Sequence, residues 1–171
     1  MAPSALALDI DGTITTANDR VVWNLVQSAR ALGAHIAINT ARPSLYCFEP
    51  DDETARLAAV EDHYCYTGKS WLFRNLVHNV PESKVQNMEK IQAKGKVARR
   101  ECCFLVDDRR ENVRAIDEAG YTGIHVDYRK GITRSHALDI LARLTACAQE
   151  HGNSGLRPDA VVEGPNLPGP R

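Results

Sequence analysis

The sequence predicts an α/β fold, in which a mostly parallel central sheet has helices on both of its faces. Short, continuous apolar runs alternate along the chain with longer segments whose apolar residues follow the helical period. The runs lack the polar alternation of a half-exposed strand, so they indicate strands buried on both sides. With 171 residues, 43% of them hydrophobic, the chain has the length and composition of one domain with a substantial core.

The first predicted strand spans residues 5–10 and ends before a turn at Gly12. Apolar positions in residues 18–32 repeat with the helical period, Asn18 or Asp19 can cap this helix, and Gly33 ends it. Residues 34–39 (AHIAIN) predict a second buried strand, which ends at Thr40.

Residues 41–83 are less regular, because Pro43 and Pro50 interrupt them. One helix is predicted from Asp51 onward and another in residues 69–76 (KSWLFRNL). This segment is the only candidate insertion, and we expect it to form at most a small helical lid.

The second half of the chain repeats the alternation of helix and strand. The predicted elements are a helix from Ser83 to about Gly95 with Pro81 just before it, a strand at 102–106, a helix around 113–119 closed by Gly120, a strand at 121–126, and an amphipathic helix through 138–144. Together with the first half, they predict a Rossmann-like three-layer sandwich.

Residues 1–150 are expected to form this single domain, and residues 151–171 a disordered C-terminal tail. The tail holds four prolines and four glycines and little apolar surface, so burial cannot offset the entropy of ordering it.

Composition argues against several classes of function. The net charge is −1 and basic residues are not concentrated, so no nucleic-acid binding is predicted. No apolar run is long enough to span a bilayer, and the N-terminus lacks the features of a signal peptide. The five cysteines show no CxxC spacing, so neither a disulfide framework nor a zinc site is expected. A reducing, cytoplasmic setting without membrane association follows as the expectation.

Polar residues collect where the predicted strands end. In an open parallel sheet, ligands bind outside the carboxyl ends of the strands, so these residues are expected to converge. They are Asp9 and Asp11 after the first strand, Thr40 after the second, Lys84 early in a helix, and Asp107 and Asp108 after a later strand. Acids that can attack phosphorus, transfer a proton and hold Mg²⁺, with an amine to offset charge, predict phosphoryl transfer.

This set resembles the haloacid dehalogenase (HAD) superfamily of aspartate-nucleophile phosphohydrolases. DIDGT at residues 9–13 matches the DxDxT signature of the family, and IAINT matches the strand that ends in Thr or Ser, at Thr40. Lys84 matches the helix-borne lysine, with Lys69 as the fallback. CFLVDDRREN matches the strand that ends in paired acids, with Asn112 four positions beyond the second acid.

The resemblance implies a phosphatase, because phosphatase members carry an acid where Asp11 stands. Asp9 would be the nucleophile that forms an aspartyl phosphate, and Asp11 would protonate the leaving oxygen and then activate water. The segment after the first motif is too short for a cap domain, which implies a capless or minimally capped member with an open site. The expected substrate is then a phosphorylated small molecule, or a macromolecule.

The resemblance also implies the remaining roles. Magnesium would be held by Asp9, the backbone carbonyl of Asp11 and the acids of the fourth motif, Asp108 directly and Asp107 through water or as an orienting group, with Asn112 in support. Phosphoryl oxygens would be bound by Thr40, Lys84 and the residues next to the first two motifs, namely Gly12, Thr13, Ala41 and Arg42; for Arg42 a surface role is equally open.

Two alternatives within the family stay open: a phosphotransferase or mutase, which passes the phosphate from Asp9 to an alcohol, and a catalytically weak binding or regulatory module. A response-regulator receiver domain also combines acids, Thr, Lys and magnesium. In receivers, however, the acidic pair ends the first strand and the phosphorylated Asp comes later, whereas here the order is reversed.

Overall fold

The computed structural model describes residues 2–43, 60, 62–66 and 76–155. They contain one sheet of five strands, in the order β3-β2-β1-β4-β5, in which every neighbouring pair is parallel. The strands are β1 (Ala5–Leu8), β2 (His35–Pro43), β3 (Asp62–Tyr66), β4 (Cys103–Asp107) and β5 (Thr122–His125).

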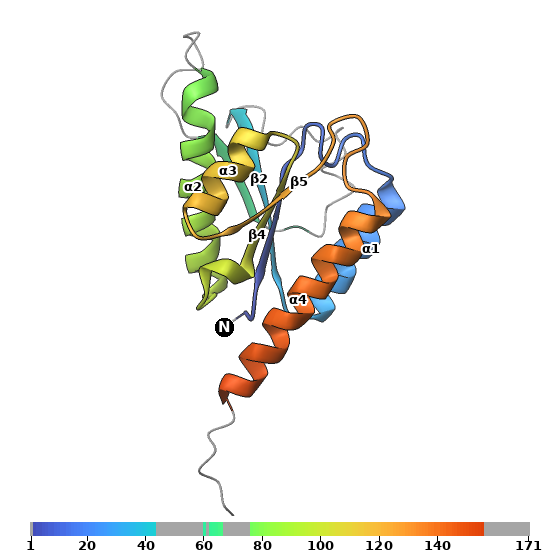
Figure 1. Cartoon of the computed structure of the whole chain (residues 1–171), viewed down its shortest axis with the longest axis vertical. Helices are drawn as coiled ribbons and strands as arrows, with labels where there is room; N and C mark the ends of the chain where they lie inside the picture. Colours follow the sequence, from blue (N-terminus) through green and yellow to red (C-terminus); the bar gives the residue numbers. More distant parts are fainter. Residues whose placement is uncertain (1, 44–59, 61, 67–75, 156–171) are drawn as a thin grey trace, which may run out of the picture.

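Four α-helices cover the two faces of this sheet (Figure 1). They are α1 (Asp19–Ala31), α2 (Leu76–Gly95), α3 (Arg110–Glu118) and α4 (Arg134–Gly155), and a short 3-10 helix, η3 (Arg100–Cys102), precedes β4. Helices α1 and α4 lie together on one face, and α2 and α3 on the other. The predicted α/β, Rossmann-like three-layer architecture is therefore confirmed.

The two central strands explain why their sequences read as continuous apolar runs. Every residue of β1 and of β4 is buried, because helices cover both faces of the sheet. One core unites both faces, and Leu6, Ile38, Phe104 and Leu105 are among its fully buried side chains.

Helix α1 begins and ends where its sequence predicts. The side chain of Asn18 caps its N-terminus by accepting a hydrogen bond from the Arg20 backbone N–H at 3.0 Å. Gly33 follows its C-terminus with φ of +79°, a conformation that costs glycine little.

The middle of the chain differs from the prediction. The sequence did not predict β3, an edge strand with the buried Asp62, whose carboxylate lies 2.9 Å from Nε2 of His35. Helix α2 begins at Leu76, not at Ser83 as predicted, and holds Pro81 in its interior, where the proline nitrogen can donate no helical hydrogen bond. The helix predicted from Asp51, and that at 69–76 apart from Leu76, lie outside the described residues.

Two predicted ends are also corrected. Strand β2 continues past Thr40 to Pro43, because β3 pairs with this extension across an irregularity in register. Helix α4 runs to Gly155, so residues 151–155 are helical and do not begin a disordered tail. Residues 156–171 lie outside the described part of the chain.

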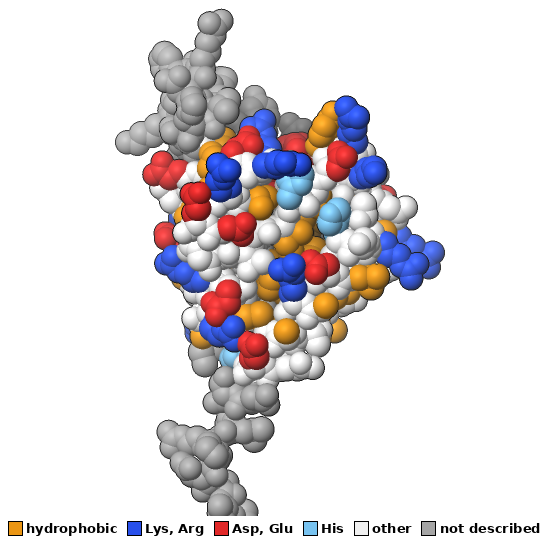
Figure 2. Space-filling model, viewed as in Figure 1, with side chains coloured by type: hydrophobic (Ala, Val, Ile, Leu, Met, Phe, Trp, Pro, Cys, Tyr) orange, Lys and Arg blue, Asp and Glu red, His pale blue; other side chains and the backbone are white. Residues whose placement is uncertain are grey.

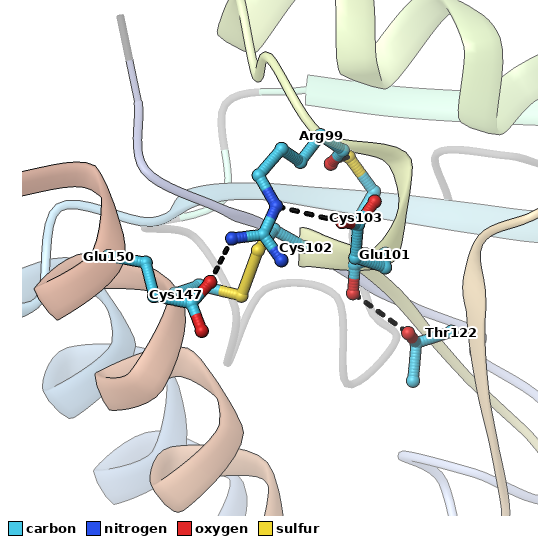
Figure 3. The surroundings of a disulfide bond; sticks show 7 residues. All are labelled: Arg99, Glu101, Cys102, Cys103, Thr122, Cys147 and Glu150. Carbon is cyan, nitrogen blue, oxygen red and sulfur yellow. Dashed lines mark hydrogen bonds and ion pairs between the residues drawn. A yellow bond between two sulfur atoms is a disulfide. The ribbon is translucent and has the colours of Figure 1, made fainter. Parts of the chain in front are cut away.

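A disulfide joins Cys102 of η3 to Cys147 of α4, contrary to the expectation from cysteine spacing (Figure 3). The two residues are 45 positions apart, so no local motif announces the pair. Arg99 strengthens the same junction by pairing with Glu150 of α4 and, at 2.8 Å, with Glu101. Cys65 is also disulfide-bonded.

The outer surface mixes charges of both signs. On the face in Figure 2, Lys and Arg side chains lie among Asp and Glu side chains, with hydrophobic side chains between them. Within the described ranges, no helix combines the length and the apolar character needed to cross a bilayer.

Candidate active site

The order of the strands sets the position of the candidate site. The strand order reverses between β1 and β4, which pair in parallel with Leu8 opposite Val106. The Asp9 N–H continues this pairing by donating to the Val106 carbonyl at 3.0 Å. Asp9, which directly follows β1, and Asp107, the last residue of β4, therefore lie side by side at the switch point, where α/β folds bind their ligands.

Three carboxylates meet there. Asp9, Asp107 and Asp108 each offer one oxygen atom, and these three atoms all lie within 4.8 Å of one another. Asp9 and Asp107 are buried, and Asp108 is partly exposed. Such a group of like charges is costly unless cations compensate it.

Lys84 supplies one compensating charge. It lies on α2, its side chain is 1% exposed, and its Nζ lies 2.8 Å from Asp9 Oδ1 and 2.9 Å from Asp107 Oδ2. Burial by itself lowers the pKa of the ammonium, but the two carboxylates outweigh it and the pKa of Lys84 is raised. The lysine is therefore a fixed positive charge, as predicted from the third motif.

The acids still carry more negative charge than Lys84 can offset. Burial raises the pKa of Asp9 to about 6, with a further contribution from Asp107 and an opposing one from Lys84. Burial, and then Asp107, also raise the pKa of Asp108. Additional positive charge placed here would thus be strongly favoured.

Asp107 is fully engaged with protein groups. Asn112 donates from Nδ2 to both of its oxygens at 3.1 Å, and the Arg109 backbone N–H donates to Oδ1 at 2.9 Å. The Asp108 carboxylate lines the cavity described below and is hydrogen-bonded by its own backbone N–H, but among the described residues no side chain donates to it. The geometry therefore favours Asp108 as a direct metal ligand and Asp107 as the orienting group.

An asparagine pair that the sequence analysis missed holds Lys84 in place. The side-chain Nδ2 of Asn39, on β2, donates to the backbone carbonyl of Lys84 at 3.0 Å. The backbone carbonyl of Asn39 in turn accepts a hydrogen bond from Lys84 Nζ. Asn87, one turn further along α2, donates to Asn39 Oδ1 and to the Cys65 carbonyl, each at 3.1 Å. The available signal was an amide inside the otherwise apolar run IAINT.

Asp11 lies apart from the three-acid cluster. Its side chain is 63% exposed. Arg42 donates to both of its oxygens, from Nε to Oδ2 at 2.9 Å and from Nη2 to Oδ1 at 2.7 Å. The Asp11 carboxylate is not a member of the candidate metal group, and metal binding by its backbone carbonyl stays a prediction. This contact with Asp11 decides neither of the two roles left open for Arg42, binding of phosphate and a position on the surface, and both stay predictions.

Residues of the first two motifs surround the acids. Thr40 is buried, and its Oγ1 accepts a hydrogen bond from the Arg42 N–H at 3.2 Å. Thr13 is also buried, and its Oγ1 has no hydrogen-bond partner among the described residues. Gly12 has φ of +73°, and a Cβ there would lie 2.7 Å from Asp108 Oδ2, so the close approach of the two loops requires glycine.

A cavity of about 440 Å³ opens over these residues. Its lining includes the predicted site residues Asp9, Asp11, Gly12, Ala41, Asp108 and Asn112, together with Val80, Arg109 and Tyr128. The last three were not predicted, because nothing in their local sequence marks them. Lys69, the fallback for the lysine, lies outside the described residues.

The donor set fits a hard divalent cation. Carboxylate oxygens are the ligands that Mg²⁺ prefers, and one or two of them, with water and phosphate oxygens, complete its usual shell. Asp9 and Asp108 line the cavity with these oxygens, in a cluster of three acids whose negative charge Lys84 offsets only in part.

Comparisons with known proteins bear on the fold. No protein-family model and no curated protein matches this chain. A solved structure, that of an uncharacterized protein from Corynebacterium glutamicum, is similar with a TM-score of 0.59 and 20% identity, over 85% of this chain and 96% of that chain. At this identity the likeness supports the α/β fold alone.

Proposed function

We propose that this protein is a magnesium-dependent phosphatase that hydrolyses phosphate monoesters through an aspartyl phosphate on Asp9. The observation that carries the proposal is the cluster at the switch point, in which Lys84 binds both Asp9 and Asp107 while Asp108 faces the cavity. A structural ion pair would need one carboxylate for one lysine. Three acids that converge beside a cavity favour catalysis.

In the first step, an Asp9 carboxylate oxygen attacks phosphorus, and the bond between phosphorus and the ester oxygen breaks. Lys84, bound to Asp9 Oδ1 at 2.8 Å, fixes the nucleophile and offsets negative charge on the phosphoryl group. Asp11 donates a proton to the leaving alcohol oxygen. In this structure Arg42 donates to both Asp11 oxygens, which is the arrangement of a carboxylate, so Asp11 must give up at least one of these bonds to carry the proton that it donates.

In the second step, water attacks the phosphorus of the aspartyl phosphate, the acyl-phosphate bond breaks, and Asp9 is regenerated with release of inorganic phosphate. Asp11, now a carboxylate, accepts the proton of the attacking water. The Thr40 hydroxyl and the backbone N–H groups near Gly12 and Ala41 are the groups proposed to bind phosphoryl oxygens.

Magnesium, held by Asp9 and Asp108 with Asp107 as the orienting group, would neutralise the charge of the phosphoryl group. The excess of carboxylates over ammonium groups in the cluster supports this assignment. The expected cytoplasmic setting stays a prediction, and the Cys102–Cys147 disulfide weighs against a strongly reducing compartment.

The test is release of inorganic phosphate from a panel of phosphate monoesters, with magnesium and with a chelator. Wild type is compared with Asp9→Asn and with Asp139→Asn, a matched control on the exposed surface of α4. We expect magnesium-dependent release that Asp9→Asn abolishes and the control retains. Release that survives in Asp9→Asn would refute the nucleophile, and transfer of phosphate to an added alcohol without release would replace the phosphatase by a phosphotransferase.

A further inference from the structure

Tyr128 is a large aromatic side chain that lines the cavity and yet is 56% exposed. It follows β5, in the loop that packs against the loop after β1. The position that a Cβ would take on Gly12 lies 3.2 Å from Tyr128 Cβ and 2.7 Å from Asp108 Oδ2. The tyrosine therefore stands directly beside the acids proposed to bind metal and phosphate.

Arg129 fixes the tyrosine ring. Its Nε donates to the Tyr128 hydroxyl at 2.9 Å, and its guanidinium carbon lies 5.3 Å from the ring centroid, which is the geometry of a cation–π contact. Two contacts from one side chain hold the ring while more than half of the tyrosine stays open to solvent. A ring held in this way loses little entropy when a ligand stacks on it.

The loop that carries both residues is itself well ordered by hydrogen bonds. The Lys130 and Gly131 N–H groups donate to the Asp127 carbonyl at 2.9 and 2.8 Å. Ile132 N–H donates to the Thr13 carbonyl at 3.0 Å, which ties this loop to the first motif. Gly131 packs so closely that a Cβ there would lie 2.4 Å from the Thr13 carbonyl oxygen. The backbone that carries the aromatic ring is thus tied to the loop that follows β1.

From this placement we infer that Tyr128, backed by Arg129, is a stacking platform, and that the preferred substrates are phosphate monoesters whose alcohol carries a planar aromatic ring. This inference rests on the proposed function, because the phosphate is taken to bind beside Asp9, the proposed nucleophile. An exposed aromatic ring stacks on any planar π-system, so a nucleobase and a simple aryl group share the required chemistry. Arg109, which also lines the cavity, adds positive charge that attracts the phosphate.

The test compares kcat/KM for three esters: phenyl phosphate, adenosine 5′-monophosphate and glycerol 3-phosphate, the last without a ring. In wild type, we expect at least one aromatic ester to be preferred over glycerol 3-phosphate by about tenfold or more. Tyr128→Ala should remove that preference, whereas Tyr128→Phe should keep most of it because the ring remains. Trp23→Ala, which removes another exposed aromatic side chain on α1, is the matched control and should keep the preference.

The ester whose preference is lost in Tyr128→Ala identifies the kind of aromatic ring that the substrate carries. If Tyr128→Ala loses the preference in kcat/KM for adenosine 5′-monophosphate alone, the substrate is a nucleotide. If it loses the preference for phenyl phosphate alone, the substrate is an aryl ester. If Tyr128→Ala lowers kcat/KM equally for all three esters, or leaves the ratio unchanged, the platform is refuted.

A binding measurement separates this inference from the proposed function. In the Asp9→Asn background with magnesium present, calorimetry should show tighter binding of the aromatic ester than of glycerol 3-phosphate, and Tyr128→Ala should abolish the difference. If wild type releases no phosphate but this difference is found, the phosphatase proposal fails and the platform stands. If phosphate is released but no difference in binding or in kcat/KM depends on Tyr128, the platform fails alone.

Discussion

Lys84 shows how one residue can support both the stability and the chemistry of the site. Its four-carbon stem crosses the packed interior, and its ammonium contacts Asp9 and Asp107, the two buried carboxylates of the cluster. A buried ion pair adds little net stability compared with an apolar alternative, but removal of one partner leaves buried charge uncompensated. The contribution of Lys84 to the free energy of unfolding is therefore measured by replacing it.

Lys84→Met should lower the free energy of unfolding by about 3–5 kcal/mol in the presence of chelator, because Asp9 and Asp107 would be left buried without a cation. Urea unfolding measures this change. Lys90→Met, an exposed substitution on the same helix, should change stability by less than about 0.5 kcal/mol. A loss below about 1 kcal/mol for Lys84→Met would mean that the acids are compensated by something other than this lysine.

Gly12→Ala should weaken magnesium binding. The new methyl group would lie 2.7 Å from Asp108 Oδ2, and the backbone at φ of +73° is itself unfavourable for alanine, so Asp108 must move. We expect an affinity loss of about tenfold or more, measured by calorimetric titration with MgCl₂. Gly152→Ala, where a Cβ meets nothing within 4 Å, is the control, and an unchanged affinity in Gly12→Ala would contradict the assignment of Asp108 as a ligand.

At the scale of single residues, the charged residues of the site could be predicted from the sequence, whereas the asparagines that hydrogen-bond around Lys84 could not. Asp9, Asp107 and Asp108 stand at the ends of apolar runs, where a carboxylate is unexpected unless it has a task. Asn39 and Asn87 could not be identified in this way, because each is informative only when β2 and α2 are known to face one another. Tyr128 likewise gains its meaning from the loop that packs beside it.

At the scale of elements, the pattern of burial decided which parts of the chain were predictable. Strands β1 and β4 are buried along their whole length, so their apolar runs stand out from the rest of the chain. Strand β3, at the edge of the sheet, mixes buried and partly exposed residues and includes a buried aspartate, and it shows neither a continuous run nor a clear alternation. The start of α2 was predicted too late because proline favours the first turn of a helix, whereas Pro81 lies inside this one.

The disulfide between η3 and α4 yields a prediction for the C-terminal helix. It closes a loop of 45 residues, and the chain-entropy estimate for such a loop is about 4 kcal/mol. The double variant Cys102→Ser with Cys147→Ser should lose stability of this order in thermal or urea unfolding. Cys103→Ser, which alters the adjacent buried free thiol, should lose much less, and equal losses in both would show that packing rather than the cross-link stabilises this junction.

At the scale of the whole molecule, the topology brings together groups that are far apart in the sequence. Asp9 and Lys84 are separated by 75 positions, and the acids of β4 follow later still. A parallel sheet with its reversal between β1 and β4 places all of them at one edge. The fold class was predictable because the alternation of strand and helix constrains topology strongly, whereas the cross-link between distant cysteines follows from the final packing of α4 and carries no local pattern.

Magnesium should therefore stabilise the folded state and not the unfolded chain, in which the ligands are scattered. A cation that binds only the folded protein adds about 2.7 kcal/mol to the free energy of unfolding at a hundredfold excess over its Kd. The Tm should thus rise steadily with the logarithm of the MgCl₂ concentration, measured by calorimetry at constant ionic strength.

Asp108→Asn should abolish most of this rise, because it removes the partly exposed carboxylate that lines the cavity, and Asp139→Asn should retain it. A rise that NaCl reproduces, or that Asp108→Asn leaves intact, would assign the effect to general screening of charge. In that case the three acids would be held by Lys84 and the protein alone, and the assignment of a magnesium site at the switch point would be wrong. The rise in Tm with magnesium thus connects the charge of the cluster, the topology that assembles it, and the chemistry proposed for Asp9.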